Sequence, residues 1–293
     1  MYRRLARALI GVPLVVAVAA LASWQLPAGG RHAATWWWSE EDPNFGGFSG
    51  IHVTKDGTGF TAVTDKGFWM TGRLHRDGPR LTGVETGPLR PLRGEDGAPL
   101  PVPQSDAEGL RLASDGTAFI AFEQRVGIRR YPTMDGVPTR LPNDPFRNLP
   151  FNAGLESVAL LDGRVVTVPE VPRDDIFTVW IHDPDWTPLF EIPARGIFRI
   201  SDADIFEGHL YILERAFLGV AFSSRVRRFD LDGGGEVTLL TTRPAKFDNL
   251  EGLSVWRDGD ETVLTMISDD NFMPFERTEL VEYRFTDASV TQR

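Results

Sequence analysis

Residues 105–131 read SDAEGLRLASDGTAFIAFEQRVGIRRY, and this stretch decides the fold of the chain. Two short apolar runs flank the dipeptide Asp115-Gly116, and an acid stands at the outer end of each run, Glu108 before the first and Glu123 after the second. Asp-Gly is a preferred dipeptide of tight hairpins, because both central residues of such a turn need positive φ. The runs are rich in β-forming residues and too short for helices. The stretch therefore predicts an antiparallel hairpin with an acid at the open end of each strand.

The same hairpin pattern occurs five times along the chain. The five segments start at Gly46, Ser105, Asn152, Ser201 and Asp248. Each turns at an acid followed by glycine, at Asp56-Gly57, Asp115-Gly116, Asp162-Gly163, Glu207-Gly208 and Asp258-Gly259. The spacing is regular, at 48 residues from Glu108 to Glu156, 48 from Glu156 to Asp204 and 47 from Asp204 to Glu251. A repeat of this length with short strands and tight turns is typical of a four-stranded propeller blade, so the sequence predicts an all-β propeller.

The number of blades follows from the number of repeats. Five repeats predict five blades, and a sixth, degenerate blade is the alternative. It would be built from the Pro/Gly-rich insertion 87–103, which lengthens the first interval to 59 residues, or from residues 36–45 paired with the C-terminal strand. We expect the segment around Trp36–Trp38 to pair with the last repeat, because closing the ring removes exposed sheet edges. A binding patch is the alternative for these tryptophans. The predicted propeller domain runs from residue 35 to residue 290.

Acidic residues recur at both ends of the repeated hairpin. The leading residues, at the start of its first strand, are Glu108, Glu156, Asp204 and Glu251, with Ser49 in the first repeat. The trailing residues, at the end of its second strand, are Asp65, Glu123, Glu170, Glu214 and Asp269 with Asp270. Both sets lie at the open end of one hairpin, and equivalent positions of propeller repeats surround one axis. We therefore expect these carboxylates to converge on one mouth of the central channel.

Carboxylates at this density repel one another, so that several hold their protons unless a cation neutralises them. Calcium fits such a site best, because it takes six to eight oxygen ligands, and magnesium is the second choice. The predicted metal ligands are Asp65, Glu123, Glu170, Asp204, Asp269 and Asp270. The residues predicted to serve in catalysis, as metal-binding or base groups, are Glu108, Glu156, Glu214 and Glu251. The alternative for Glu108, Glu156 and Glu251 is a structural brace that accepts backbone N–H groups from the neighbouring blade.

A polar donor stands just past each trailing acid. These donors are Lys66, Arg125, Arg173, Arg215 and Asn271. Acids and cations at one mouth suit an anionic ligand that is held partly by metal and partly by guanidinium groups. Phosphate esters fit that description. The predicted substrate-binding residues are Lys66, Arg125, Arg215 and Asn271.

Several other chemistries are excluded by the sequence. The absence of cysteine excludes disulfides, thiolate catalysis, cysteine-ligated zinc and a lipid anchor on cysteine. The string GGFSG at 46–50 lacks the G-x-S-x-G spacing of a nucleophile elbow, and there is no H-E-x-x-H, Walker or dinucleotide-binding motif. A metal-bound water that acts on an ester or phosphoester remains the simplest enzymatic hypothesis.

The N-terminus indicates export. Residues 1–22 read MYRRLARALIGVPLVVAVAALA, with a basic start, a short apolar run and a small-x-small end that is typical of a secretory signal. The run is shorter than a spanning helix needs and contains Pro13. An uncleaved N-terminal anchor helix is the alternative. The sequence thus predicts a periplasmic or extracellular monomer that touches a membrane only through this segment, if it stays uncleaved. The net charge of −10 argues against nucleic acid as a partner.

A set of short motifs resembles the esterase-like phytase family. The matching strings are Gly47-Phe48-Ser49-Gly50-Ile51, Asp106-Ala107-Glu108-Gly109-Leu110, Leu155-Glu156-Ser157-Val158, Leu213-Glu214-Arg215, Asp248-Asn249-Leu250-Glu251-Gly252-Leu253 and Ser268-Asp269-Asp270-Asn271-Phe272. They occur in the family's order between Phe45 and Phe285. Ser157 is a departure, since a glycine usually follows that glutamate. The resemblance implies export, a propeller-like fold and hydrolysis of phosphate or other esters, with calcium.

Three hypotheses for the function follow. The first is an exported, calcium-dependent hydrolase of phosphomonoesters or related esters, with an anionic small-molecule ester as substrate. The second is a non-catalytic propeller that binds a ligand or partner and uses calcium structurally. The third is a lactonase-like propeller with a single central metal.

Overall fold

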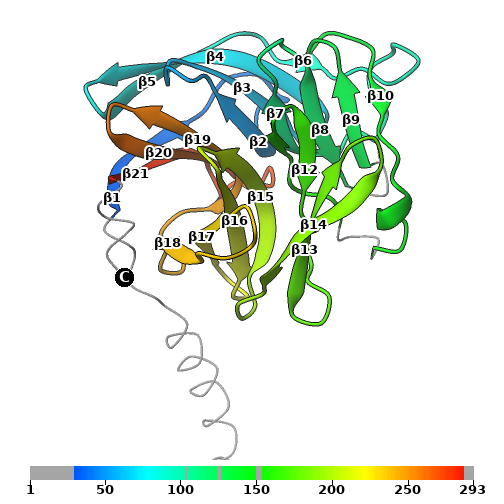
Figure 1. Cartoon of the computed structure of the whole chain (residues 1–293). Helices are drawn as coiled ribbons and strands as arrows, with labels where there is room; N and C mark the ends of the chain where they lie inside the picture. The colour runs from blue at the N-terminus through cyan, green and yellow to red at the C-terminus, as the bar shows by residue number, and fades with distance from the viewer. Residues whose placement is uncertain (1–29, 103, 124–126, 150–153, 287–293) are drawn as a thin grey trace, which may run out of the picture.

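Five antiparallel sheets surround one central axis (Figure 1). The computed structural model describes residues 30–102, 104–123, 127–149 and 154–286. The predicted all-β propeller of five four-stranded blades is confirmed. The signal or anchor helix expected at residues 1–22 lies outside the described residues, as does the end of the domain predicted at residue 290. None of the described residues forms a helix that is long and apolar enough to cross a membrane.

The blades follow one another along the chain, and each begins with its innermost strand. Blade 1 contains β2 (Phe48–Val53), β3 (Gly59–Thr64), β4 (Phe68–Asp77) and β5 (Arg80–Thr86), with the short β6 (Arg90–Pro91) paired to β4. Blade 2 contains β7 (Ala107–Leu112), β8 (Ala118–Phe122), β9 (Gly127–Tyr131) and β10 (Thr139–Arg140). A 3-10 turn, η1 (Asp144–Phe146), leads to blade 3, which contains β11 (Ala159–Leu161), β12 (Arg164–Thr167), β13 (Ile176–His182) and β14 (Trp186–Pro193).

The last two blades complete the ring. Blade 4 contains β15 (Arg199–Phe206), β16 (His209–Phe217), β17 (Phe222–Asp230) and β18 (Val237–Thr241). Blade 5 contains β19 (Asn249–Asp258), β20 (Glu261–Asp269) and β21 (Thr278–Thr286), with β1 (Arg31–Trp38) as its outermost strand. The insertion proposed above as a possible sixth blade adds only β6 to blade 1 within the described residues.

The inner hairpins turn at the acid-glycine dipeptides, as predicted. In blade 3 the turn residues Asp162 and Gly163 have φ of 51° and 80°, and in blade 4 Glu207 and Gly208 have φ of 46° and 76°. Positive φ at both central residues gives the turn the twist of the strands that it joins, and glycine adopts it without steric cost. These two turns therefore fix the register of the strands that they join. In blades 1, 2 and 5 the glycines Gly57, Gly116 and Gly259 have positive φ, but the acids before them do not.

Strand β1 closes the ring, which confirms the prediction made for the tryptophan-rich segment. It pairs antiparallel with β21, from Arg31 opposite Arg284 to Trp38 opposite Thr278. Trp38 is buried and its ring stacks on Phe48 of blade 1, with 4.9 Å between the ring centroids. The outermost strand of blade 5 thus also contributes to the interface with blade 1.

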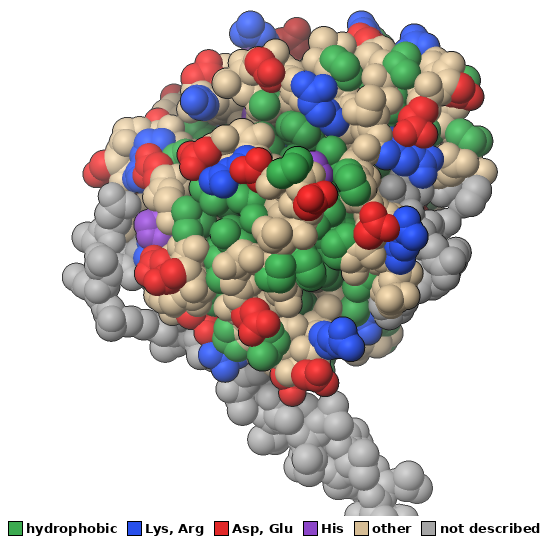
Figure 2. Space-filling view, turned by 45° about the vertical axis from the view of Figure 1, so that its right-hand side comes forward, with side chains coloured by type: hydrophobic (Ala, Val, Ile, Leu, Met, Phe, Trp, Pro, Cys, Tyr) green, Lys and Arg blue, Asp and Glu red, His purple; other side chains and the backbone are tan. Residues whose placement is uncertain are grey.

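Apolar side chains of neighbouring blades pack against each other to form the core. Leu213 and Val226 of blade 4, for example, lie in one buried cluster with Leu253 and Val281 of blade 5. The outer surface is mixed: on the face shown in Figure 2, acidic and basic side chains are interspersed, and apolar side chains gather nearer its centre.

Replacing Trp38 with alanine is expected to lower the free energy of unfolding by about 3 kcal/mol, because a large buried ring is lost and a cavity remains. Chemical denaturation followed by tryptophan fluorescence measures the change. Trp37→Ala is the matched control, since the neighbouring side chain is 65% exposed. Its effect is expected to stay within about 0.5 kcal/mol. Equal effects of the two substitutions would contradict the closing role of Trp38.

Candidate active site at one mouth of the channel

The inner strands share an irregularity that sets the geometry of the mouth. In blades 1, 2, 4 and 5 the register between the first and the second strand shifts near the start of the first strand. The shifts lie between residues 48 and 50, 107 and 110, 200 and 202, and 250 and 252. A β-bulge bends its strand and redirects the side chain that it carries. The bulged residues and their blade 3 equivalent are here called the leading ring: Ser49, Glu108, Glu156, Ser201 and Glu251.

Asp204 is not a member of the leading ring, although the repeat spacing placed it there. Ser201 occupies the bulge of β15, and Asp204 lies three residues further along the strand, opposite Tyr211. Its carboxylate lies inside the channel, where Oδ1 is 3.0 Å from Nε of Arg111 and Oδ2 accepts the backbone N–H of Val255 at 2.8 Å. The prediction of Asp204 as a mouth ligand is thus corrected: it braces blade 4 against blade 5.

The neighbouring Asp202 makes the same kind of brace. Its Oδ2 accepts the backbone N–H of Leu253 at 2.8 Å. The brace considered above for the leading glutamates is therefore made by two aspartates of β15. The hydrogen bonds that Glu251 accepts within the described residues come instead from the side chains of Asn249 and Arg215.

A second set of equivalent residues lies at the ends of the second strands. In blades 1 to 3 the backbone N–H of each such residue donates to a carbonyl oxygen two positions before the leading-ring residue of the same blade. The pairs are Asp65 with Gly47 at 2.8 Å, Glu123 with Asp106 at 3.0 Å and Glu170 with Gly154 at 3.3 Å. In blades 4 and 5 the corresponding pairs are Arg215 with Arg199 and Asp269 with Asn249. This trailing ring therefore consists of Asp65, Glu123, Glu170, Arg215 and Asp269.

Glu214 precedes the trailing ring by one residue and so points to the other side of its strand. It is fully buried inside blade 4. Both of its oxygens accept hydrogen bonds from Arg225 and Arg227, at 2.7 to 3.0 Å. A carboxylate occupied by two guanidinium groups has no oxygen left for a substrate or a proton transfer. The prediction of Glu214 as a catalytic residue is corrected to a structural role.

The remaining acids come together at the mouth. The carboxylates of Asp106, Glu108 and Glu123 have ligand atoms within 4.8 Å of one another. Burial and the charges of Glu156 and Asp106 raise the pKa of Glu108. Burial also raises the pKa of Asp65 to about 7, helped by Asp269 of blade 5 and Asp106 of blade 2. Carboxyl groups of different blades thus lie close enough to influence each other's ionisation.

Two more residues of the rings have strongly raised pKa values. Burial raises the pKa of Glu156 to about 8, against the opposing effect of Arg215 and with the help of Glu170. Burial and a hydrogen bond with Asp106 raise the pKa of Glu123 to about 7. At neutral pH the acids of the mouth therefore retain protons, and a bound cation would displace those held by its own ligands.

Arg215 is the basic residue that lies among these acids. Its guanidinium group, carried by blade 4, pairs with Glu251 of blade 5 and lies 3.5 Å from Glu156 of blade 3. It also donates to Oδ1 of Asn249 at 3.2 Å. Arg199, at the start of β15, lies 3.5 Å from Glu170. Both arginines can face an anion at the mouth.

The other predicted groups have local partners. Nζ of Lys66 lies 2.9 Å from the ring centroid of Phe272. Oδ1 of Asp270 accepts the backbone N–H groups of Gly47 and Phe272, and Nδ2 of Asn271 donates to Glu276 at 2.7 Å. These residues shape the loop after β20. The predicted substrate-binding residue Arg125 lies outside the described residues.

Sequence reasoning missed two residues of the mouth. Asp106 and Arg199 both stand two positions before the leading ring, where the other blades have Gly47, Gly154 and Asn249. Because this position holds four different residue types in the five blades, no repeated residue type identified it. The DAEG string that contains Asp106 was the one available signal.

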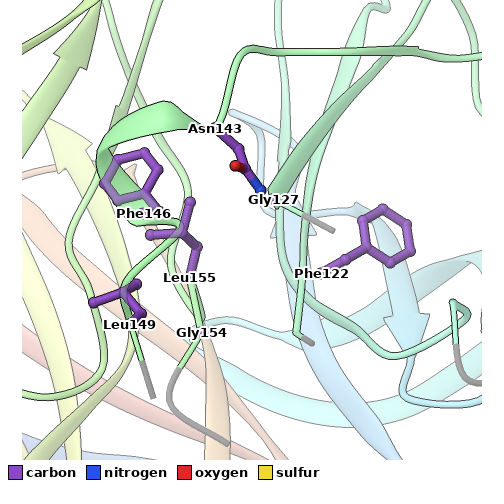
Figure 3. Close-up of a pocket in the computed structure, with 7 residues that line it drawn as sticks. All are labelled: Phe122, Gly127, Asn143, Phe146, Leu149, Gly154 and Leu155. Carbon is purple, nitrogen blue, oxygen red and sulfur yellow. The ribbon is translucent and has the colours of Figure 1, made fainter. Parts of the chain in front are cut away.

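The donor set fits a hard divalent cation. Oδ1 of Asp65, Oε2 of Glu170 and Oγ of Ser49 are buried and have no hydrogen-bond partner among the described residues. Buried oxygens without partners are costly unless an ion or water satisfies them. The carboxylates of Asp106, Glu108 and Glu123, whose ligand atoms lie within 4.8 Å of one another, are oxygen ligands of the kind that calcium takes. A separate cavity of about 20 Å³ between blades 2 and 3 is lined by Phe122, Phe146, Leu149 and Asn143 among others, and it is large enough only for water (Figure 3).

The chain was compared with solved structures, with curated proteins and with protein families. Two similar solved structures are the PQQ-bound aldose sugar dehydrogenase from Streptomyces coelicolor, at 12% identity and TM-score 0.45 over 89% of this chain and 100% of that chain, and the RRP9 WD40 repeats, at 9% identity and TM-score 0.47 over 89% and 99%. No match was found among curated proteins. The family described as "Phytase-like: Esterase-like activity of phytase" matches residues 43–272, which is most of the propeller. The chain therefore belongs to this phytase-like family.

Proposed function

We propose that the protein is an exported, calcium-dependent hydrolase of phosphomonoesters or related anionic esters, and that the reaction takes place at the acidic mouth. One observation carries the proposal: carboxylates from different blades converge there with Arg215 among them. Membership of the phytase-like family supports an ester as substrate. The signal-like pattern at residues 1–22 supports export.

The residues have distinct roles in this proposal. Asp106, Glu108 and Glu123 hold the cation, since their oxygens already lie within 4.8 Å of one another. A bound calcium ion would polarise the ester and make a coordinated water more acidic. Arg215 orients the anionic group through its guanidinium donors.

Glu156 is suited to proton transfer. Its raised pKa, about 8, means that it keeps a proton at neutral pH despite the nearby Arg215. A general acid works best when its pKa lies near the working pH, because it then still holds its proton and gives it up readily. We therefore assign Glu156 to protonation of the leaving oxygen.

The test is hydrolysis by the full chain, freed of metal and then supplied with calcium. p-Nitrophenyl phosphate, phytate and simple p-nitrophenyl esters are the substrates. Glu123→Gln is expected to lower the calcium-dependent kcat/KM at least about 100-fold, and Arg215→Gln about 10- to 100-fold. Glu95→Gln is the matched control, because Glu95 is an exposed acid that pairs with Arg140 on the outer part of blade 2.

Absence of hydrolysis of all three substrate types in calcium would refute the enzymatic proposal. A calcium-dependent rise in melting temperature without turnover would then favour the non-catalytic binding propeller. An unchanged kcat/KM in Glu123→Gln would instead show that the mouth is not the active site.

A further inference from the structure

A cavity of about 490 Å³ opens beside the mouth between blades 3 and 4. Its lining consists of Glu170, Ile197, Arg199, Arg215, Phe217 and Phe222. We call this cavity the vestibule. Its volume lies within the range of small-molecule sites and exceeds what a phosphate group alone needs.

The vestibule carries an excess of positive charge, unlike the rest of the mouth. Arg199 and Arg215 face it together with one acid, Glu170. The side chain of Arg199 is 56% exposed, and its ion pair with Glu170 is long, at 3.5 Å. A guanidinium group with donors open to solvent can bind a phosphoryl or carboxylate group bidentately.

Another part of the vestibule wall is apolar and unusually exposed. Ile197 is 65% exposed and Phe217 is 59% exposed. Phe217 pairs with Phe222 at the end of the β16–β17 hairpin, and their ring centroids lie 5.0 Å apart at an interplanar angle of 44°. Side chains of this size leave water only when an apolar surface covers them, and aromatic rings pack well on other flat rings.

We propose that the vestibule binds the organic part of the substrate, and that this part is an aryl group attached to the anionic phosphoryl or carboxyl group. The inference rests on the function proposed above and names its substrate class. The anionic group lies against Arg199 and Arg215, and the aryl group lies on Phe217, Phe222 and Ile197. A fully polar ester such as phytate would leave this apolar wall in water, so it is the poorer ligand.

Binding of two non-hydrolysable probes to the calcium-loaded full chain tests the proposal. Phenylphosphonate and methylphosphonate carry the same anionic group and differ in the aryl ring. Titration calorimetry is expected to show about 10-fold tighter binding of phenylphosphonate. Phe217→Ala is expected to remove that preference and leave the affinity for methylphosphonate unchanged. Arg199→Gln is expected to weaken both probes by a similar factor.

Val220→Ala is the matched control, because Val220 is 96% exposed in the same hairpin and does not line the vestibule. Equal binding of the two probes, no binding of either, or a preference that survives in Phe217→Ala would overturn the inference. Phe217-dependent binding without hydrolysis would refute the proposed function alone. Equal hydrolysis of aryl phosphates and phytate, unchanged in Phe217→Ala, would refute the inference alone.

Discussion

Replacing Arg111 with methionine is expected to lower the free energy of unfolding by about 5 kcal/mol, because it leaves two buried carboxylates without their cation. The guanidinium group of Arg111 crosses the channel from the inner strand of blade 2. It lies 3.4 Å from Asp202 and 3.0 Å from Asp204, and it donates to the carbonyl groups of Ala203 at 2.6 Å and Ile51 at 3.1 Å. It also donates to the carbonyl group of Leu253 in blade 5 at 2.5 Å, so one side chain links the inner strands of four blades.

Denaturant unfolding of Arg111→Met at pH 8 and at pH 5 measures the effect. Burial already raises the pKa of Asp202 to about 7 although Arg111 opposes the rise, and loss of Arg111 raises it further. A carboxyl group whose folded pKa lies above its unfolded pKa destabilises the fold as pH rises through that interval. The variant is therefore expected to lose more stability at pH 8 than at pH 5.

A second variant keeps this prediction testable if Arg111→Met fails to fold. Adding Asp202→Asn removes one of the buried charges, so the double variant is expected to recover part of the loss. A loss below about 1 kcal/mol in Arg111→Met would contradict the assigned role.

Without divalent cations, the protein is expected to be more stable at pH 5.5 than at pH 8. The carboxyl groups of Asp65 and Glu123 have pKa values of about 7, and that of Glu156 about 8. All three lie above the ordinary values of unfolded Asp and Glu, so the folded chain binds more protons between about pH 4 and pH 8. Stability therefore falls across this interval as the mouth loses protons.

Calcium is expected to reverse that loss. A ligand at 100 times its Kd adds about 2.7 kcal/mol, and each kcal/mol raises the Tm of a domain of this size by about 2–4 °C. Added calcium is therefore expected to raise the Tm at pH 8 by about 5–10 °C, and by less at pH 5.5, where protons compete for the carboxylates. Differential scanning calorimetry measures both values.

Glu123→Gln serves as the control for calcium, since it removes a charged ligand and keeps the size of the side chain. It is expected to lose most of the calcium-dependent rise. If calcium left the Tm unchanged at both pH values, the proposed metal site would be refuted.

The periodicity of the sequence was sufficient to predict the blades and their closure. Asp-Gly turns and a spacing near 48 residues identify the inner hairpins, and the open end of each hairpin lies at the mouth. Leading and trailing acids such as Glu108 and Glu123 could therefore be predicted to meet. The closing role of Trp38 followed from the need of a sheet edge for a partner.

Individual side chains could not be assigned so reliably, because their direction changes with every residue along a strand. Glu214 and Arg215 are adjacent, yet one is buried under two arginines and the other lies among the acids of the mouth. A bulge adds one residue without any mark in composition, and so Ser201 rather than Asp204 occupies the mouth position of blade 4. Spacing alone carries no information on either effect.

The pairing of β1 with β21 has a consequence for how the protein is made. Arg31 is ion-paired with Glu261, 230 residues later, and Trp38 lies opposite Thr278. While the chain is still being synthesised and β21 has not yet emerged from the ribosome, β1 has no partner strand. The final blade therefore assembles only after translation of that strand, and until then two unpaired sheet edges are open to chaperones or to other chains.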